Sequence, residues 1–464
     1  MLSFLLVRLH TDKAVLQDVA DYGDVSLIFA YFVLFNVLLA YGMETAFFRF
    51  FNSDQKKETV LSTSAISLLL SSSLVFVVGY LFKQEISNLI HIDPDYIVLV
   101  LWILFFDALV IIPFAYLRAL GKPAKYTVIK LINVVLNLGF NIFLLLFLKS
   151  CAETSSFWDL FYRPNFEVHY IFIANLIASA ATLLLLIPFY FKLNYNFNLK
   201  LWRQMLRYAT PVLVAGIAFS INETFDRILL ERLLPENLSK ASIGTYSACY
   251  KLALFMTLFA AAYRLGIEPF FFSSAKDKEA KINYAKILEL FVVFGALILL
   301  IVVVFVDVLK LILIPNESYW EAMSVVPILL LAYLFLGIYH NLSVWYKITD
   351  LTKFGAYISI FGAILTLAIN LLFIPKFGYM ASAIATLVAY ASMAFISYFI
   401  GQKYYKVPYN LNKIGLYLIL SIGFSALSFQ VFREQYIVGG ALILIFTAFV
   451  WVKEKTNIKQ LIKS

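Results

Sequence analysis

The stretch Ile-Val-Leu-Val-Leu-Trp-Ile-Leu-Phe-Phe-Asp-Ala-Leu-Val-Ile-Ile-Pro-Phe-Ala-Tyr-Leu, residues 97–117, decides the fold. As a helix, this stretch is long enough to cross the roughly 30 Å hydrocarbon core of a bilayer. Only helices and closed barrels satisfy their backbone hydrogen bonds in that environment. The stretch therefore predicts a transmembrane helix, and it is one of thirteen such runs in the chain.

The other runs follow one another with short interruptions. Hydrophobic residues make up 62% of the chain and charged residues 14%, against roughly 25% charged in soluble proteins. No stretch is polar enough to form a soluble domain, so we expect an all-α integral membrane protein. The expected spans are 24–45, 60–82, 97–117, 126–148, 169–191, 208–229, 243–264, 285–306, 323–345, 354–373, 380–400, 413–431 and 436–452.

The positive charge is distributed in a way that indicates topology. When the segments between spans are assigned alternately to two sides, one side holds 25 of the 37 Lys and Arg residues and the other holds 10. Because cytoplasmic loops carry the excess of Lys and Arg, the first side is cytoplasmic, and so is the C-terminus. The net charge of +9 therefore does not predict a nucleic-acid partner, although it favours contact with anionic lipid heads.

Cysteine and histidine usage predicts neither a disulfide framework nor a metal site. Cys151 falls in an expected outside loop and Cys249 inside a span, and the four histidines are scattered. We expect no cofactor.

An internal repeat divides the chain. Residues 22–26 (Tyr-Gly-Asp-Val-Ser) and 243–247 (Ile-Gly-Thr-Tyr-Ser) each open a span, and residues 41–44 (Tyr-Gly-Met-Glu) and 265–268 (Leu-Gly-Ile-Glu) end them. Both copies run from outside to inside, which is typical of a parallel repeat about an axis along the membrane normal. The repeat predicts two pseudo-symmetric transmembrane bundles followed by two more helices, a 14-helix architecture with a truncated first helix.

The expected domains follow from this repeat. They are an N-terminal bundle over 1–191, a cytoplasmic linker over 192–207, a C-terminal bundle over 208–400, and two final helices with a cytoplasmic tail over 401–464. The helix that should match 208–229 would begin near Met1, where only a short apolar stub precedes residue 10. Such a stub cannot cross a bilayer. Either the true start lies upstream or the stub lies at the membrane interface.

One further stretch carries a family resemblance. Residues 369–390, Ile-Asn-Leu-Leu-Phe-Ile-Pro-Lys-Phe-Gly-Tyr-Met-Ala-Ser-Ala-Ile-Ala-Thr-Leu-Val-Ala-Tyr, contain a Pro-x-x-Gly turn before a run of small residues. This stretch resembles the N-L-x-x-I-P-x-x-G-x-x-G-A-A-x-A-T pattern of the polysaccharide (O-antigen-type) flippases in the multidrug/oligosaccharidyl-lipid/polysaccharide exporter superfamily. Residues 226–227, 244–251 and 118–122 also resemble that family, whereas Ala381 stands where the family commonly has Gly.

The resemblance implies a function. It implies a multi-pass transporter, not an enzyme, of the bacterial inner membrane, which flips a polyprenyl-diphosphate-linked oligosaccharide by alternating access for cell-surface polysaccharide biosynthesis. Polysaccharide assembly proteins are its candidate partners, besides the lipid-linked substrate and membrane lipid. Proton or sodium coupling is a hypothesis, with a carboxylate such as Asp107 or Glu223 changing protonation between the two states.

Polar side chains within spans are the candidates for transport, because charges there are costly and cations suit a diphosphate. The candidates are Glu44, Arg49, Asp107, Lys130, Asn133, Asn137, Asn222, Glu223, Asp226, Arg227, Lys251 and Arg264.

Structural roles for the same residues remain open. Asp226 and Arg227 can form a static ion pair. Lys130 and Arg264 can extend to the interface, and the Asn residues of helix 126–148 can join helices by hydrogen bonds.

Two candidates favour function more directly. Lys251 lies deep in its span and needs a partner or an anionic substrate. Asp107 is a lone carboxylate in the middle of its span.

Three competing functions also stay open, and one of them, a non-transporting membrane scaffold, would not need charges within its spans. An exporter of drugs or organic cations from the same superfamily would favour acidic groups in its cavity. A polymerase or ligase of lipid-linked glycans would need a substantial outside catalytic loop, and the longest outside loop, 149–168, is thin in chemical groups.

Overall fold

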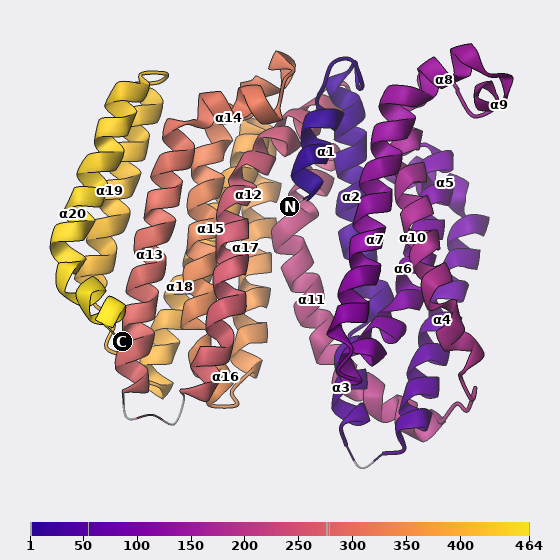
Figure 1. Cartoon of the computed structure of the whole chain (residues 1–464), viewed down its shortest axis with the longest axis horizontal. Helices are drawn as coiled ribbons and strands as arrows, with labels where there is room; N and C mark the ends of the chain where they lie inside the picture. Colours follow the sequence, from indigo (N-terminus) through magenta and orange to yellow (C-terminus); the bar gives the residue numbers. More distant parts are fainter. Residues whose placement is uncertain (1, 54, 275–276, 278, 464) are drawn as a thin grey trace. The chain divides into compact units, whose positions relative to one another are not determined.

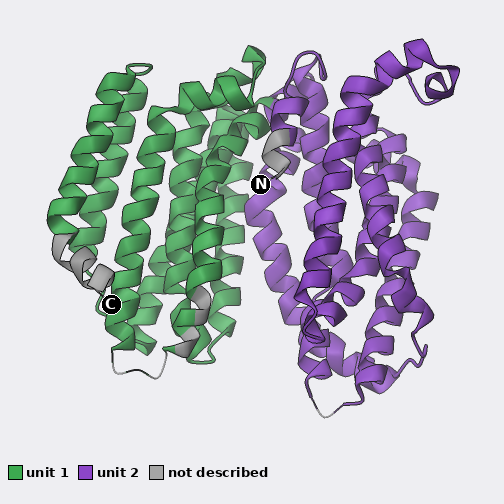
Figure 2. Ribbon diagram, viewed as in Figure 1, with its two compact units in different colours: residues 1, 245–464 green, residues 2–244 purple. Residues whose placement is uncertain are grey.

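A computed structural model of the chain describes residues 2–53, 55–274, 277 and 279–463. The chain divides into two compact units, Leu2–Gly244 and Thr245–Ser464 (Figures 1 and 2). Over the described residues, thirteen helical segments are long and apolar enough to cross a membrane. This confirms the predicted all-α membrane fold with thirteen spans.

The first unit contains these elements: α1 (Leu2–His10), α2 (Val19–Ala40), α3 (Met43–Phe51), α4 (Lys57–Leu81), α5 (Lys83–Ile90), α6 (Pro94–Ala119), α7 (Pro123–Ile142), the π-helical η1 (Phe143–Phe147), α8 (Leu148–Thr154), α9 (Ser156–Asp159), α10 (Glu167–Phe191) and α11 (Leu199–Leu233). Helix α12 (Glu236–Ser273) begins in this unit and continues into the next.

Helix ends in this unit follow local chemistry. Asp93 accepts a hydrogen bond from the Asp95 backbone N–H and Pro94 occupies the first turn, so α6 begins there. Asn198 likewise caps α11, accepting from the Leu201 N–H at 3.0 Å. Within the bundle, α10 packs on α6 and α7, α11 packs on α2, and α4 packs on α6.

A break separates α2 from α3 inside one predicted span. Tyr41 and Gly42 both adopt left-handed backbone, with φ of 32° and 72°. A Cβ on Gly42 would lie 2.6 Å from the Ala209 carbonyl oxygen of α11. Glycine at this position therefore provides both the positive φ and the close approach of α3 to α11.

The second unit contains α13 (Ala280–Val304), α14 (Val306–Leu313), the 3₁₀-helical η2 (Glu317–Ser324), α15 (Val325–Leu342), α16 (Val344–Ile348), α17 (Lys353–Phe377), α18 (Tyr379–Tyr404), α19 (Leu411–Gln430) and α20 (Tyr436–Lys463). Helices α15 and α17 both pack on α18, and α13 packs on α15. Helices α19 and α20 lie against α13 at one edge of this unit (Figure 1).

The stretch that carries the family resemblance forms a tight helix turn. Helix α17 ends at Phe377, Gly378 has a φ of 54°, and α18 begins at the next residue. Ser382 is fully buried and its hydroxyl donates to the Asn370 side-chain oxygen at 2.8 Å. The motif therefore packs α17 closely against α18 through small residues.

The compact units divide the chain at Gly244, so α11 packs with the first unit. The division into repeats at 192–207 stays a prediction. The side chain of Glu268, which the repeat aligns with Glu44, lies outside the described residues.

Candidate functional site

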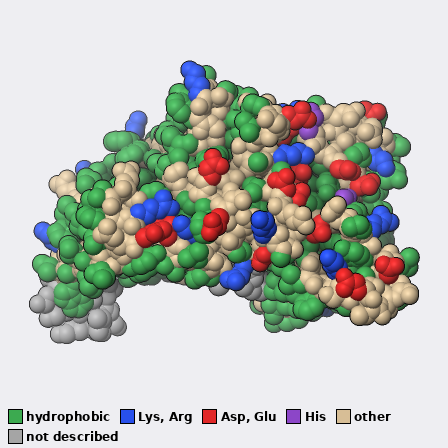
Figure 3. Space-filling model, turned by 90° about the horizontal axis from the view of Figure 1, so that it is seen from above, with side chains coloured by type: hydrophobic (Ala, Val, Ile, Leu, Met, Phe, Trp, Pro, Cys, Tyr) green, Lys and Arg blue, Asp and Glu red, His purple; other side chains and the backbone are tan. Residues whose placement is uncertain are grey.

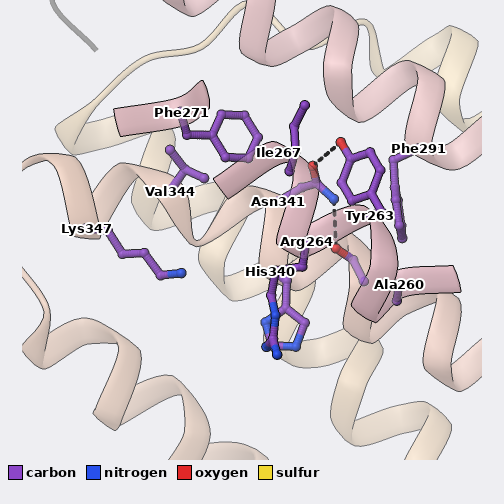
Figure 4. Close-up of a pocket in the computed structure, with 11 residues that line it drawn as sticks. Ala260, Tyr263, Arg264, Ile267, Phe271, Phe291, His340, Asn341, Val344 and Lys347 are labelled. Atoms are coloured by element: carbon purple, nitrogen blue, oxygen red, sulfur yellow. Dashed lines mark hydrogen bonds between the residues drawn. The ribbon is translucent and has the colours of Figure 1, made fainter. Parts of the chain in front are cut away.

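A pocket in the second unit brings together polar and cationic side chains (Figure 4). Two helical faces form most of its wall. Helix α12 contributes residues at the spacing of one helix face, and α15 continues into α16 with a second such face. The lining residues are Ala260, Tyr263, Arg264, Ile267, Phe271, Phe291, Gly337, His340, Asn341, Val344 and Lys347.

Hydrogen bonds fix the polar wall of the pocket. The Tyr263 hydroxyl donates to the Asn341 side-chain oxygen at 2.8 Å, and the Asn341 amide donates to the Gly337 carbonyl oxygen at 3.0 Å (Figure 4). Since Asn341 is buried, this chain of bonds connects α12 and α15 and holds the phenol and the amide in one arrangement.

Among the described side chains that line the pocket, the charged groups are positive. Arg264 and Lys347 are cationic, His340 is titratable, and none of these described residues is Asp or Glu. Among the described residues, no carboxylate forms an ion pair with Arg264. Guanidinium and ammonium groups suit phosphate, and a phenol and an amide suit hydroxyl groups.

The pocket is narrow. It contains about 400 Å³ of unfilled space, part of it open, and its enclosed part has room for about one water molecule. A larger ligand therefore requires α12 to move away from α15 and α16.

Gly337 sets the width of the pocket on its α15 side. A Cβ at this position would lie 2.2 Å from Cζ of Phe291, a ring that packs between Phe259 and Tyr263 with centroid distances of 5.2 and 4.7 Å. The absence of a side chain at Gly337 lets the ring of Phe291 pack directly on the α15 backbone.

Two predicted candidates of the first unit lie on α3, Glu44 in its first turn and Arg49 in its last turn. Glu44 accepts a hydrogen bond from Arg118, whose guanidinium lies 5.0 Å from the Phe48 ring centroid. The Arg49 guanidinium lies 4.3 Å from the Tyr208 ring centroid. Both side chains are thus joined to neighbouring helices within the same unit.

Four other candidates of the first unit lie along α6 and α7. Asp107 accepts a hydrogen bond from the Ser179 hydroxyl of α10 at 2.8 Å, and the Asn133 amide donates to the Thr182 hydroxyl of α10 at 2.9 Å. Lys130 is exposed and lies 4.7 Å from the Phe114 ring centroid.

The last of these four, Asn137, accepts two hydrogen bonds from the Asn141 amide, at its backbone oxygen (2.8 Å) and its side-chain oxygen (3.2 Å). Asn141 also bonds His10 of α1 at 3.0 Å. The Asn residues thus join α7 to α10 and α1.

A buried polar group lies on α11. The Arg227 guanidinium contacts the Asp226 carboxylate at 2.9 Å and donates to the Glu223 carbonyl oxygen at 3.1 Å. Asn222, one turn earlier, is also buried. Lys251 lies on α12 in the other unit, so its predicted juxtaposition with this group stays a prediction.

The sequence predictions included only Arg264 among the pocket's polar residues. They missed Tyr263, His340, Asn341 and Lys347 as site residues. The available signal was spacing: positions 337, 340, 341, 344 and 347 share one helical face, with three polar residues at the expected cytoplasmic end.

The comparisons with known proteins address the fold and the family. No curated protein matches the chain in sequence. The structure is similar to that of "Lipid II flippase MurJ, inward closed conformation", with a TM-score of 0.72 and 15% identity over 98% of this chain and 99% of that one.

Multidrug transporters have similar structures. An inward-facing multidrug resistance MATE family transporter of the MOP superfamily matches with a TM-score of 0.66 and 12% identity, over 90% of this chain and 95% of that one. The MATE multidrug transporter DinF-BH matches with a TM-score of 0.59 and 13% identity, over 88% of this chain and 92% of that one.

The sequence itself matches the family described as "Polysaccharide biosynthesis protein" over residues 15–274, which is more than half of the chain. The predicted resemblance to this branch of the exporter superfamily is therefore confirmed. The chain belongs to the polysaccharide biosynthesis protein family, and it is a multi-pass membrane protein with the helical fold of the MOP superfamily transporters.

Proposed function

We propose that this protein flips a polyprenyl-diphosphate-linked oligosaccharide across the bacterial inner membrane by alternating access, for the synthesis of a cell-surface polysaccharide. Family membership supports a role in polysaccharide biosynthesis. The similarity to the lipid II flippase and to MATE transporters supports a fold suited to translocation.

The observation that carries the proposal is the cationic pocket at the α12–α15 contact. Arg264 and Lys347 would bind the two phosphates, and Tyr263 and Asn341 would bind sugar hydroxyls. The described lining residues include cations and no carboxylate, which suits an anionic ligand and disfavours an organic cation. The narrow width of the pocket suggests that substrate enters when α12 and α15 separate.

Coupling to a gradient is a further part of the proposal. Asp107 is an ionisable group within a predicted span, and its carboxylate accepts a hydrogen bond from the neutral Ser179 hydroxyl. A proton or a sodium ion at this carboxylate would bias α6 and α10 between two arrangements. Flipping of labelled substrate in proteoliposomes that continues after both gradients are collapsed would exclude this coupling.

The first experiment is to measure the lipid-linked glycan pool after deleting the gene, by mass spectrometry, with the membrane side determined in vesicles. We expect a finished oligosaccharide-lipid to accumulate on the inner face and to disappear on re-expression. An unchanged pool would favour a drug exporter, which the MATE similarity keeps as the second candidate. Accumulation on the outer face would instead indicate a polymerase or ligase.

Variants of the pocket test the site itself in the same vesicles. Arg264→Ala and Lys347→Ala should each lower flipping at least about tenfold, because a hydrogen bond to a charged group contributes roughly 1.5–3 kcal/mol. Lys353→Ala is the matched control, since Lys353 is an exposed cation on α17 outside the pocket lining. If all three changes lowered flipping equally at equal folded yield, Arg264 and Lys347 would be ordinary cations at the membrane interface and not ligands of the substrate.

A further inference from the structure

A second pocket, in the first unit, differs in character from the cationic one. Its wall is formed by one face each of α2, α4, α5 and α6, and by Ile92 in the connection between α5 and α6. The residues are Ile28, Tyr31, Phe35, Leu74, Val75, Val78, Gly79, Ile86, Ile90, Ile92, Ile97, Val100, Leu101 and Leu104. Among the described residues that line it, only Tyr31 has a polar side-chain atom, so the pocket suits a hydrocarbon ligand.

This pocket is roomy and opens at the lipid-facing surface. It contains about 1020 Å³ of unfilled space, part of it open to the surface. Its α4 side is strongly exposed, with Leu74 at 65% and Val78 at 45% of full exposure. Since α4 is long and apolar enough to span a membrane, these side chains face lipid, and the opening is accessible from the hydrocarbon.

The length of the pocket fits part of an acyl chain. On both α2 and α6 the lining extends over eight residues, from Ile28 to Phe35 and from Ile97 to Leu104. Seven steps of about 1.5 Å separate the first of these residues from the last, which is roughly 10 Å, or about one third of the hydrocarbon core.

Charges of both signs border the pocket. Arg232 donates to the hydroxyl of the lining residue Tyr31 and to the carbonyl oxygen of Leu89, next to the lining residue Ile90. His91, between Ile90 and Ile92, contacts Glu231 at 2.7 Å. Glu85 and Asp93 have exposed side chains, and each is next in sequence to a lining residue, Ile86 and Ile92 respectively.

Charges of both signs occur elsewhere at this end of the helices as well. The rim differs from those other charges only because it lies beside the apolar opening. Figure 3 shows Asp/Glu and Lys/Arg side chains intermixed at the helix ends that are uppermost in Figure 1. A headgroup with a phosphate and an ammonium fits such a rim: the phosphate would bind Arg232, whose side chain is 36% exposed, and the ammonium would bind Glu85 or Asp93. A prenyl diphosphate, with negative charge alone, would face the same carboxylates unfavourably.

We propose that this pocket, at the contact of α2, α4, α5 and α6, binds one zwitterionic phospholipid, with an acyl chain between the helices and an ethanolamine headgroup at the rim formed by Arg232, Glu85 and Asp93. By the distribution of basic residues, this end of the helices is the non-cytoplasmic one. The bound lipid belongs to the leaflet on that side.

Native mass spectrometry of the detergent-purified full chain tests the site with dioleoylphosphatidylethanolamine as the probe. We expect one lipid retained per chain. Val78→Trp fills the pocket and should weaken retention about tenfold (about 1.4 kcal/mol), equivalent to losing burial of roughly two methylene groups. Val77→Trp is the matched control, because Val77 is 51% exposed on the same turn and does not line the pocket.

Leu74→Trp is the second pocket variant, in case Val78→Trp folds poorly, and it should also weaken retention. Equal retention in the Val77 and pocket variants would overturn the proposal, because it would indicate lipid bound elsewhere on the surface. Dioleoylglycerol, dioleoylphosphatidylglycerol and undecaprenyl phosphate test the headgroup. Equal or tighter retention of any of these three would overturn the assignment of a zwitterionic ligand.

Discussion

At the residue scale, the buried charges of the second unit are held in clusters of defined geometry. On α14, Asp307 is only 3% exposed. Arg433, in the turn between α19 and α20, contacts both of its carboxylate oxygens at 3.0 and 3.1 Å, and Lys310 contacts one at 2.5 Å. Burial raises the pKa of Asp307, but the hydrogen bonds from Arg433 and Lys310 outweigh burial and hold this pKa below its ordinary value of 3.8.

This cluster predicts a pH-dependent contribution to stability. Replacing Asp307 by Asn should lower the free energy of unfolding by about 2 kcal/mol near neutral pH, because two cations lose their buried partner. A carboxyl group whose pKa is lowered in the folded state stabilises the fold above its unfolded pKa, and this stabilisation is lost as the pH falls through the folded pKa.

Thermal unfolding of both proteins in detergent, from neutral pH to below pH 3.8, measures this difference. The unmodified protein should be more stable than Asp307→Asn by a constant amount near neutral pH, and this difference in stability should shrink below pH 3.8. An advantage that stays constant through the acid range would assign the effect to packing instead of charge.

At the element scale, two glycines determine how α2 meets the beginning of α12. A Cβ on Gly23 would lie 1.9 Å from the Lys240 carbonyl oxygen, and one on Gly244 would lie 2.1 Å from the Val19 carbonyl oxygen and 3.1 Å from the Gly23 nitrogen. These are the two glycines that the sequence repeat aligns. Equivalent positions in contact are what a two-fold axis between the repeats would produce, but the repeat itself stays a prediction.

The helix contact predicts a large effect from adding one methyl group. Gly23→Ala or Gly244→Ala should destabilise the protein by about 1–3 kcal/mol, because the obstructing atoms are backbone and cannot move aside. Gly139→Ala is the control, since nothing lies within 4 Å of that Cβ and Ala is the better helix former. The fraction that stays monodisperse after heating measures the difference, and equal behaviour of the three variants would contradict the close contact.

The last two helices are fixed by a different device. Lys413 of α19 contacts Glu289 of α13 at 2.9 Å and Glu454 of α20 at 2.5 Å, and the Tyr417 hydroxyl donates to Glu454 at 2.6 Å. Glu454 is only 2% exposed. One ammonium group thus connects three helices.

Removing this ammonium should therefore cost more than removing an ordinary surface charge. Lys413→Met should lower the free energy of unfolding by roughly 3 kcal/mol, because it leaves two carboxylates without their cation. Lys403→Met, at an exposed position in the last turn of α18, should have little effect. Thermal unfolding of both variants measures the contrast, and a mild phenotype for Lys413→Met would show that apolar packing alone holds α19 and α20.

At the scale of the whole molecule, the sequence predicts the spans much better than it predicts the site. Each span is a local property, because about twenty apolar residues must form a helix in a bilayer wherever the helix lies. The pocket depends on tertiary structure: Arg264 is a visible candidate, but its neighbours His340 and Lys347 are more than seventy residues away in the chain. The break at Tyr41 and Gly42 was also missed, since hydropathy continues through it.

The orientation of the whole chain can be tested with its own cysteines. Cys151 lies on α8 and is partly exposed, whereas Cys249 is fully buried and should not react. Because basic residues predict that α8 is outside and the α3–α4 connection is inside, a membrane-impermeant maleimide should label Cys151 in intact spheroplasts. In a Cys151→Ser background, Ser53→Cys, at an exposed position between α3 and α4, should be labelled only after permeabilisation. The topology would be inverted if Ser53→Cys were labelled in intact spheroplasts and Cys151 of the unmodified protein were not. The cationic pocket would then lie at the outer end of α12, where a flippase would release its substrate instead of receiving it.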